Sequence, residues 1–126
     1  MNSNELDDDC MKTLGDFIKN SKTINNININ DNKITDKGIE ILLPYLIDNT
    51  TIKNINISWN KGITDKSVPL LIEIIQKSNI QDINIYETSI TEVEREKIEL
   101  ELSISIDQRE IPLITIGNIK SASKTE

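Results

Sequence analysis

Ile24-Asn-Asn-Ile27-Asn-Ile29 is the stretch that decides the fold, because the chain repeats its spacing at fixed intervals. Copies begin at Ile24, Ile52 and Ile80, so successive starts are 28 residues apart (52 − 24 = 28 and 80 − 52 = 28). A weaker copy begins at Ile111 and keeps the three apolar positions. A fixed period of this length is typical of solenoids, in which each unit buries its apolar face only against its neighbours.

The intervals between these copies carry apolar residues at the spacing of one helix face. The sets are Ile39, Leu42, Leu43 and Leu46 in one unit, and Val68, Leu71, Ile72 and Ile75 in the next. An upstream set, 28 residues before Ile39, Leu42, Tyr45 and Leu46, consists of Met11, Leu14, Phe17 and Ile18. It predicts an N-terminal helix that acts as a degenerate cap repeat. Residues 97–106 alternate with period two and also fit a strand, but the register of the repeat favours a helix.

The full pattern, Ile-x-x-Ile-x-Ile-x-x-Asn-x-Ile, is similar to the leucine-rich-repeat signature, and the period of 28 resembles the ribonuclease-inhibitor type. This resemblance implies a right-handed α/β solenoid with about four parallel strands on the concave side and helices on the convex side. We expect one domain over residues 1–119, with repeats starting near 24, 52, 80 and 111. A disordered tail is expected at 120–126.

Residues 46–60 and 93–99 resemble, more loosely, the C-terminal repeat domain of tropomodulins and leiomodins. That resemblance implies a cytoskeletal regulator that binds actin. The tropomyosin-binding and actin-binding helices that precede this domain in the family have no counterpart in the sequence, since about ten residues precede the first helical pattern.

Several polar residues have structural interpretations. Asn32 and Asn60 occupy the Asn position of the signature, where a side-chain amide can satisfy the backbone of a turn. Thr35-Asp36 and Thr64-Asp65 fit helix N-caps followed by a favourable first-turn charge, and 91–94 fits a capping box. Pro44 lies within a helical pattern and is expected to tighten or kink that helix.

Composition excludes several classes of function. The net charge of −7 argues against nucleic acid as a partner. The absence of histidine removes the commonest general base and metal ligand. Asp7-Asp8-Asp9 lacks the spacing of a calcium loop, and the single Cys10 has no basic environment that would activate it. We therefore expect no enzyme activity, cofactor or metal site.

The sequence also predicts a cytoplasmic protein that does not bind a membrane. The acidic N-terminus does not resemble a secretory signal, and one cysteine cannot form an internal disulfide. The longest apolar run, at 39–47, is far shorter than the roughly 18 residues of a membrane span and is interrupted by Glu40 and Pro44.

Side chains that alternate with the buried isoleucines should project from the concave sheet. They form columns that include Trp59 and Tyr86, which are two of the four aromatic residues of the chain. Exposed aromatic residues among polar ones are typical of protein-binding hot spots. The predicted partner-binding residues are Tyr86, Trp59, Asp82, Asn84, Asn56, Ser58, Glu87 and Asn54. The leading hypothesis is a module that binds a protein on its concave face, and actin is the alternative partner. For Trp59, packing over the extra residue Gly62 is an equal interpretation.

Overall fold

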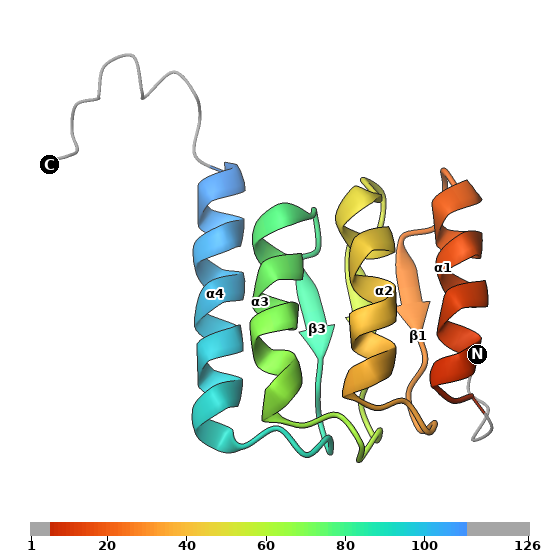
Figure 1. The fold of residues 1–126 in the computed structure, drawn as a ribbon. Helices are drawn as coiled ribbons and strands as arrows, with labels where there is room; N and C mark the ends of the chain where they lie inside the picture. Colours follow the sequence, from red (N-terminus) through yellow and green to blue (C-terminus); the bar gives the residue numbers. More distant parts are fainter. Residues whose placement is uncertain (1–5, 111–126) are drawn as a thin grey trace, which may run out of the picture.

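The fold is seen in a computed structural model, which describes residues 6–110. Helices and strands alternate over that range. They are α1 (Met11–Asn20), β1 (Asn26–Asn28), α2 (Asp36–Asp48), β2 (Asn54–Asn56), α3 (Val68–Lys77), β3 (Asp82–Asn84) and α4 (Glu92–Glu110), with short 3-10 turns η1 (Asp8–Cys10) before α1 and η2 (Asp65–Ser67) before α3. This succession confirms the predicted α/β order (Figure 1).

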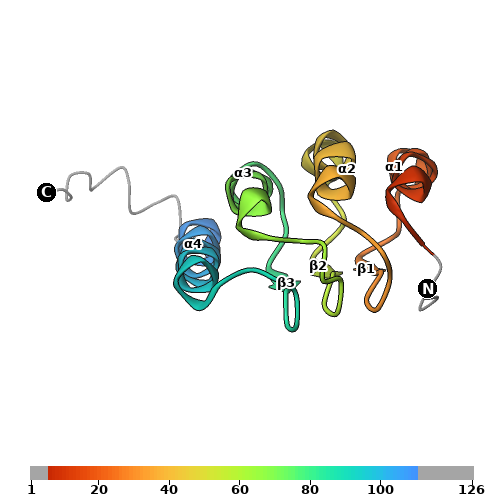
Figure 2. The ribbon, with the colours of Figure 1, turned by 60° about the horizontal axis from the view of Figure 1, so that its bottom comes forward.

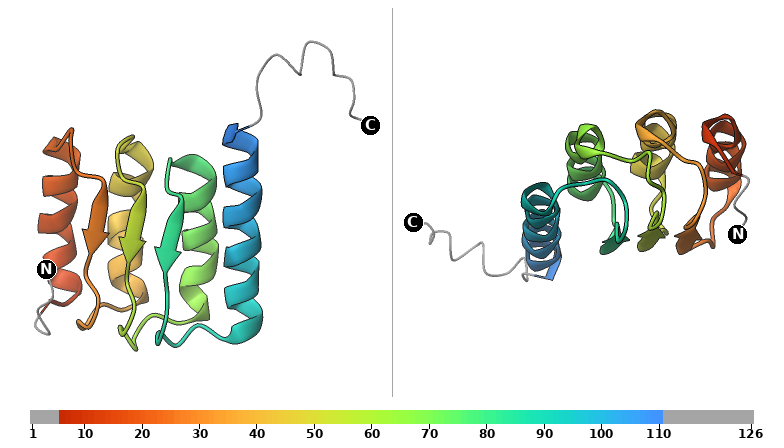
Figure 3. Two further views of the ribbon diagram at one scale, coloured as in Figure 1. Left: turned by 180° about the vertical axis from the view of Figure 1, so that it is seen from behind. Right: turned by 90° about the horizontal axis from the view of Figure 1, so that it is seen from below.

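The strands form one parallel sheet in the order β1-β2-β3. Asn26 pairs with Asn54, and Asn54 with Asp82, so neighbouring strands are offset by one full repeat (54 − 26 = 28 and 82 − 54 = 28). In Figure 2 the strands lie along one side and α1, α2 and α3 along the other. Helix α4 is displaced from that row toward the strands, as Figures 2 and 3 show. The predicted layers of strands and helices are confirmed.

The core fills the wedge between the two layers and is almost entirely aliphatic. Eight of the nine isoleucines that the strand pattern places inside are buried; they are Ile27, Ile29, Ile52, Ile55, Ile57, Ile80, Ile83 and Ile85. Ile24, at the N-terminal end of the array, is half-buried and packs against this core. Burying one such side chain stabilises the fold by roughly 1.5–3 kcal/mol, so these positions dominate its stability.

The N-terminal helix departs from the expected face at one residue. Met11 and Ile18 are fully buried, but Phe17, which the pattern aligns with Tyr45, is 59% exposed. Tyr45 instead lies against Gly15, where a Cβ atom would come within 2.3 Å of the tyrosine ring. The glycine therefore allows α1 and α2 to approach closely, and Phe17 has no neighbouring helix on its side among the described residues.

The signature asparagines hold adjacent repeats together through their backbones, as predicted. Asn60 is 0% exposed, and its amide nitrogen donates to the carbonyl oxygens of Ile29 and Ile57, each at 3.0 Å. Its side-chain oxygen accepts from the N–H of Ile34 at 3.0 Å. Asn32 accepts from the N–H of Leu6 in the same way, at 3.0 Å. Buried polar groups need such partners, so each asparagine fixes its turn.

Two of the three predicted N-terminal caps, Thr35 and Thr64, are confirmed. The hydroxyl oxygens of Thr35 and Thr64 accept from the N–H groups two residues later, each at 3.2 Å. The capping box predicted at 91–94 is wrong. The N–H of Thr91 donates to Asp65 of the preceding repeat at 2.7 Å, and the Glu94 carboxylate pairs with Lys97 at 2.9 Å.

A second ladder between repeats uses the acidic residues that follow the caps. Asp36 accepts from the N–H of Thr64 at 2.8 Å and from its hydroxyl at 2.6 Å, and it also accepts from the Ser67 hydroxyl at 2.6 Å. Asp8 accepts in the same way from the N–H and hydroxyl of Thr35, and Asp65 from those of Thr91. Each carboxylate therefore joins one helix start to the next, a role beyond the first-turn charge that the sequence suggested.

Helix α4 settles the ambiguous segment at 97–106 in favour of the helix. Pro44 lies inside α2, which nevertheless continues to Asp48. The fourth copy predicted at 111–116 and the tail predicted at 120–126 lie outside the described residues, so both stay predictions.

Asp36 is expected to make folding sensitive to acid. Burial opposes its ionisation, but hydrogen bonds from Ser67 and Thr64, together with the charge of Lys66, outweigh burial and lower the pKa of Asp36 below its ordinary value of 3.8. The carboxylate therefore adds stability above that value and loses it as pH falls through the folded-state pKa. Asp36→Asn should cost about 1–3 kcal/mol at pH 7, because an amide accepts at only one oxygen.

Urea unfolding at pH 7 and at several lower pH values measures this effect. The loss caused by Asp36→Asn should shrink as the pH is lowered below 3.8. Glu40→Gln, at an exposed carboxylate of the same helix, is the control and should change stability little at any pH. An Asp36→Asn loss that is independent of pH would contradict the assignment.

Candidate functional site

The open face of the sheet carries columns of polar side chains at the predicted positions. Two columns of residues are paired across β1, β2 and β3. The first column is Asn26, Asn54 and Asp82, and the second is Asn28, Asn56 and Asn84. The Asn54 amide nitrogen donates to the side-chain oxygen of Asn26 at 2.6 Å, which links the exposed side chains of neighbouring strands. The exposed face of the sheet is therefore lined by polar side chains at both register positions.

The second column also shapes the turns that follow the strands. The side-chain oxygens of Asn28, Asn56 and Asn84 accept from the N–H groups two residues later, at 3.1, 3.0 and 3.0 Å. Within the described part of the chain, the amide nitrogens of Asn56 and Asn84 donate to no protein acceptor. The side-chain oxygens of these asparagines therefore hold the turn backbone, and the amide nitrogens of Asn56 and Asn84 remain available as hydrogen-bond donors.

One backbone position per repeat is left-handed. Asp31, Trp59 and Glu87 have φ values of 59°, 61° and 57° and are separated by 28 residues each (59 − 31 = 28 and 87 − 59 = 28). This conformation lets the ladder continue, because the N–H of Asp31 donates to Ser58 O and that of Trp59 to Tyr86 O, each at 2.9 Å. For a residue as bulky as Trp59 it is an outlier with a cost of about 1–2 kcal/mol. Such strain is found most often at functional sites.

Trp59 belongs to a surface cluster of four side chains, which we call the aromatic cluster: Trp59, Lys61, Tyr86 and Glu87. The rings of Trp59 and Tyr86 meet edge to face, with centroids 6.0 Å apart and planes at 73°. The Lys61 ammonium lies 5.4 Å from the Trp59 ring centroid and 2.6 Å from a Glu87 carboxylate oxygen. Trp59 is 48% exposed and Tyr86 is 56% exposed, although their rings are held in place.

The structure places most of the predicted site residues together on this surface. Tyr86, Trp59, Asp82, Asn84 and Asn54 are exposed, and Asn56 and Glu87 are half-buried.

Ser58 is different, because it is 4% exposed and its hydroxyl donates to the Asn56 side-chain oxygen at 2.6 Å. It supports the turn and presents almost no surface to a partner. Gly62 packs against Thr35 and Ile34, which would lie 2.7–3.2 Å from a Cβ atom there, so it makes room for the previous repeat.

Sequence reasoning missed three residues of this surface. Lys61 follows the signature Asn, as Lys33 does 28 residues earlier, but it lies outside the strand columns from which the site was predicted. Arg95 and Glu99 come from α4 and, with Asp82, Asn84 and Tyr86, line a groove of about 260 Å³ beside β3. The Arg95 Nε atom is buried and has no acceptor among the described residues. Only the displacement of α4 toward the strands brings these side chains to the sheet.

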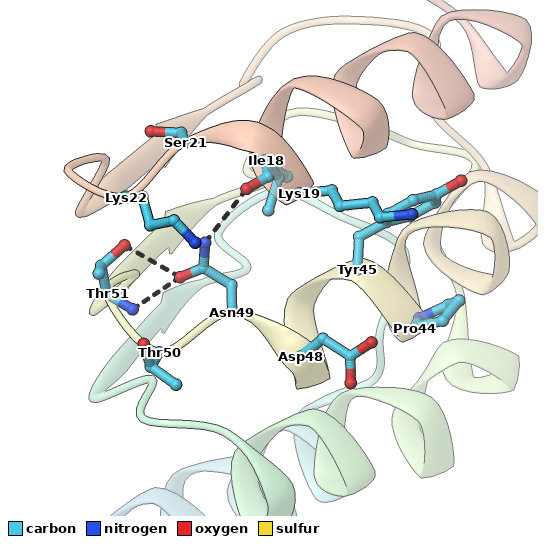
Figure 4. A pocket seen from close by; sticks show the side chains of 10 residues that line it. All are labelled: Ile18, Lys19, Ser21, Lys22, Pro44, Tyr45, Asp48, Asn49, Thr50 and Thr51. Atoms are coloured by element: carbon cyan, nitrogen blue, oxygen red, sulfur yellow. Dashed lines mark hydrogen bonds between the residues drawn. The ribbon is translucent and has the colours of Figure 1, made fainter.

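A second hollow, of about 570 Å³, lies between the C-terminal ends of α1 and α2 (Figure 4). Asn49 spans it, donating to Ile18 O at 3.3 Å and accepting from the N–H of Thr51 at 2.7 Å. Its polar groups are therefore used to join the two repeats. Among the side chains that the structure describes, no three of His, Cys, Asp or Glu gather as a metal ion would require. No helix within residues 6–110 is long and apolar enough to cross a membrane.

The fold is similar to a solved structure titled leiomodin-1 actin-binding site 2, with a TM-score of 0.68 and 19% sequence identity. The match covers 93% of this chain and 66% of the other, so the chain spans about two thirds of the length of that neighbour. No family model and no curated protein matches the sequence. The likeness establishes a leucine-rich-repeat-like fold of parallel strands and helices.

The left-handed backbone of Trp59 predicts an unusual order of stability among substitutions. Trp59→Asn should be more stable than Trp59→Val by about 1 kcal/mol, because asparagine tolerates this conformation and β-branched residues do not. The midpoints and slopes of urea denaturation, followed by circular dichroism, give both free energies of unfolding.

Gln81 provides the control, since it is exposed and its φ is not positive. Gln81→Val should be at least as stable as Gln81→Asn. Equal stabilities of the two Trp59 variants would show that the positive φ carries no such cost.

Proposed function

We propose that the chain is a protein-recognition module that binds its partner on the open face of the sheet, with the aromatic cluster at the centre of the contact. The single observation that carries the proposal is the half-exposed Trp59–Tyr86 pair, held edge to face beside Lys61. Rigid aromatic side chains lose little conformational entropy on binding and are enriched in hot spots.

The surroundings of the pair support the same proposal. Asn84 offers an amide donor, and Asp82 is an exposed carboxylate on the same strand. Arg95 lines the groove beside β3, and its buried Nε atom has no acceptor in the described part of the chain. A carboxylate or carbonyl oxygen of a partner could accept a hydrogen bond from this nitrogen. Protein interfaces typically combine aromatic residues at the centre with polar groups around them that form hydrogen bonds. This surface has both kinds of group.

The pair Tyr86→Ala with Asp82→Ala should weaken partner binding at least tenfold, because a truncated hot-spot residue costs more than about 1.4 kcal/mol. Partners recovered from the native cell by affinity purification, identified by mass spectrometry, and then titrated as purified proteins provide the measurement. Circular dichroism confirms that the variant is folded.

Lys37→Ala with Glu40→Ala is the matched control, since it also truncates two exposed side chains, one of which is a carboxylate. Both residues belong to α2, away from β3 in the row (Figure 1). The control should bind normally. If the double variant on β3 binds as tightly as the wild type, the proposal is wrong.

Actin is the second candidate for the partner. The observation that favours it is the similarity to the leiomodin-1 structure, whose title names it an actin-binding site. At micromolar protein, the rates of elongation or depolymerisation of pyrene-labelled actin should change, and Trp59→Ala should abolish the change. Unaltered kinetics would remove actin and leave the more general proposal intact.

A further inference from the structure

An apolar groove of about 650 Å³ lies at the N-terminal end of the row of repeats, between α1 and β1. Helix α1 contributes Leu14 and the exposed ring of Phe17, and Ile24 and Ile27 form the side next to the sheet. Leu6 closes one end. Ile52 and Ile80, the equivalents of Ile24 in the next two repeats, are 1% and 0% exposed, whereas Ile24 is only half-buried beside this groove.

The edge of β1 beside this groove is also unpaired within residues 6–110. On its inner side, Asn25 O accepts from the N–H of Lys53 at 2.8 Å, and the N–H of Ile29 donates to Asn56 O at 2.9 Å. Backbone groups alternate in direction along a strand, so the N–H and C=O groups of Asn26 and Asn28 point to the outer edge. Open edges of this kind are templates for an added strand.

The opposite edge of the sheet is different. Figure 3 shows α4 next to β3, and Arg95 and Glu99 of α4 line the groove along residues 82–86. Helix α4 has 19 residues, compared with 10 to 13 in α1, α2 and α3. The row of repeats therefore has a strand edge with an apolar groove at β1 and a helix beside the strand at β3.

Residues 111–116 of the chain, Ile-Pro-Leu-Ile-Thr-Ile, match the three strands in apolar spacing. We propose that this segment of one copy adds as a parallel strand to the edge of β1 in a second copy, with Ile111, Ile114 and Ile116 in the groove. In the sequence it follows α4, and α4 lies at the end of the row opposite to α1 (Figure 1), so a head-to-tail contact between two copies would bring it to the groove.

Pro112 distinguishes this position from the place of a fourth strand beside β3. The residue after the first isoleucine of a strand donates its N–H to the preceding strand: Lys53 donates to Asn25 O, and Gln81 to Lys53 O, each at 2.8 Å. Pro112 occupies the corresponding place and has no N–H, so beside β3 Gln81 O would lose this shorter bond and keep only a longer one, like the 3.2 Å bonds that Asn54 and Asp82 donate. Beside the outer edge of β1, that N–H would face away from the sheet and is not needed.

The charges at the end of the groove are complementary to the same segment. A strand parallel to β1 runs toward the turn where the N–H of Lys33 donates to Leu6 O at 2.7 Å, next to the exposed Asp7 and Asp9. Lys120 follows the proposed strand by four residues. In the proposed complex its ammonium is therefore within reach of the carboxylates of Asp7 and Asp9.

A complementation experiment with full-length variants tests the proposal. Ile114→Asp removes the donor strand and keeps the groove, while Phe17→Lys blocks the groove and keeps the donor. The wild type should show a mass that rises with concentration in sedimentation equilibrium, because each copy has one donor and one groove. Each variant alone should be monomeric, and an equimolar mixture should form a heterodimer that grows no further.

Phe17 and Thr13 are exposed, so their substitution leaves the core intact, and Thr13→Arg gives an independent block of the same groove. A labelled peptide of residues 111–120 should bind the Ile114→Asp chain, and Phe17→Lys or Thr13→Arg should weaken binding at least tenfold. A wild type that stays monomeric at millimolar concentration, or blocked variants that associate and bind the peptide like the wild type, would overturn the proposal.

Discussion

The amide of Asn60 is the interaction on which the rest of the structure depends. It is fully buried and bonds to backbone groups of its own repeat and of the preceding one, so an unsatisfied partner at any of these bonds would cost about 1–3 kcal/mol. These hydrogen bonds therefore fix the position of the turn after β2 relative to the turn after β1. Asn60 thereby aligns β2 with β1 at an offset of 28 residues. The third repeat keeps the offset and the left-handed residue, Glu87, with Thr88 at the asparagine position.

The same constraint explains why the aromatic cluster exists in this form. Trp59 is held in a costly backbone conformation because its N–H must continue the ladder to Tyr86 O. The turn thereby projects the indole ring beside the next strand, where it meets the ring of Tyr86 instead of packing into the core. A residue with a small polar side chain, such as Asp31 in the first repeat, satisfies the backbone equally well. The ring at position 59 therefore contributes surface, and the fold does not require it.

Most of the fold could be predicted because each unit obeys one spatial pattern. The isoleucine spacing placed the strands, and the signature asparagines placed the turns; both depend only on local burial and backbone satisfaction. Phe17 and Ser58 were less predictable, because their exposure depends on which neighbour is present. Phe17 occupies a core position in the pattern, yet no preceding repeat covers it among the described residues. Ser58 alternates outward, yet the turn folds over it. Arg95 reaches the sheet only because α4 leaves the row of helices, and periodicity contains no information about that shift.

A short solenoid has two kinds of surface, and they arise from different causes. Its face repeats with every unit, so its chemistry is set by residues that alternate with the core and can vary freely, as Asn54 and Asp82 do at one register position. Its ends are not repeated, because the stacking that buries each unit stops there. Within residues 6–110, a displaced helix lies beside β3 at one end of the row, and an apolar groove and an unpaired strand edge lie beside β1 at the other. The proposed recognition on the face and the proposed association at the end therefore use different residues, and either surface can change without disturbing the buried isoleucines that support both.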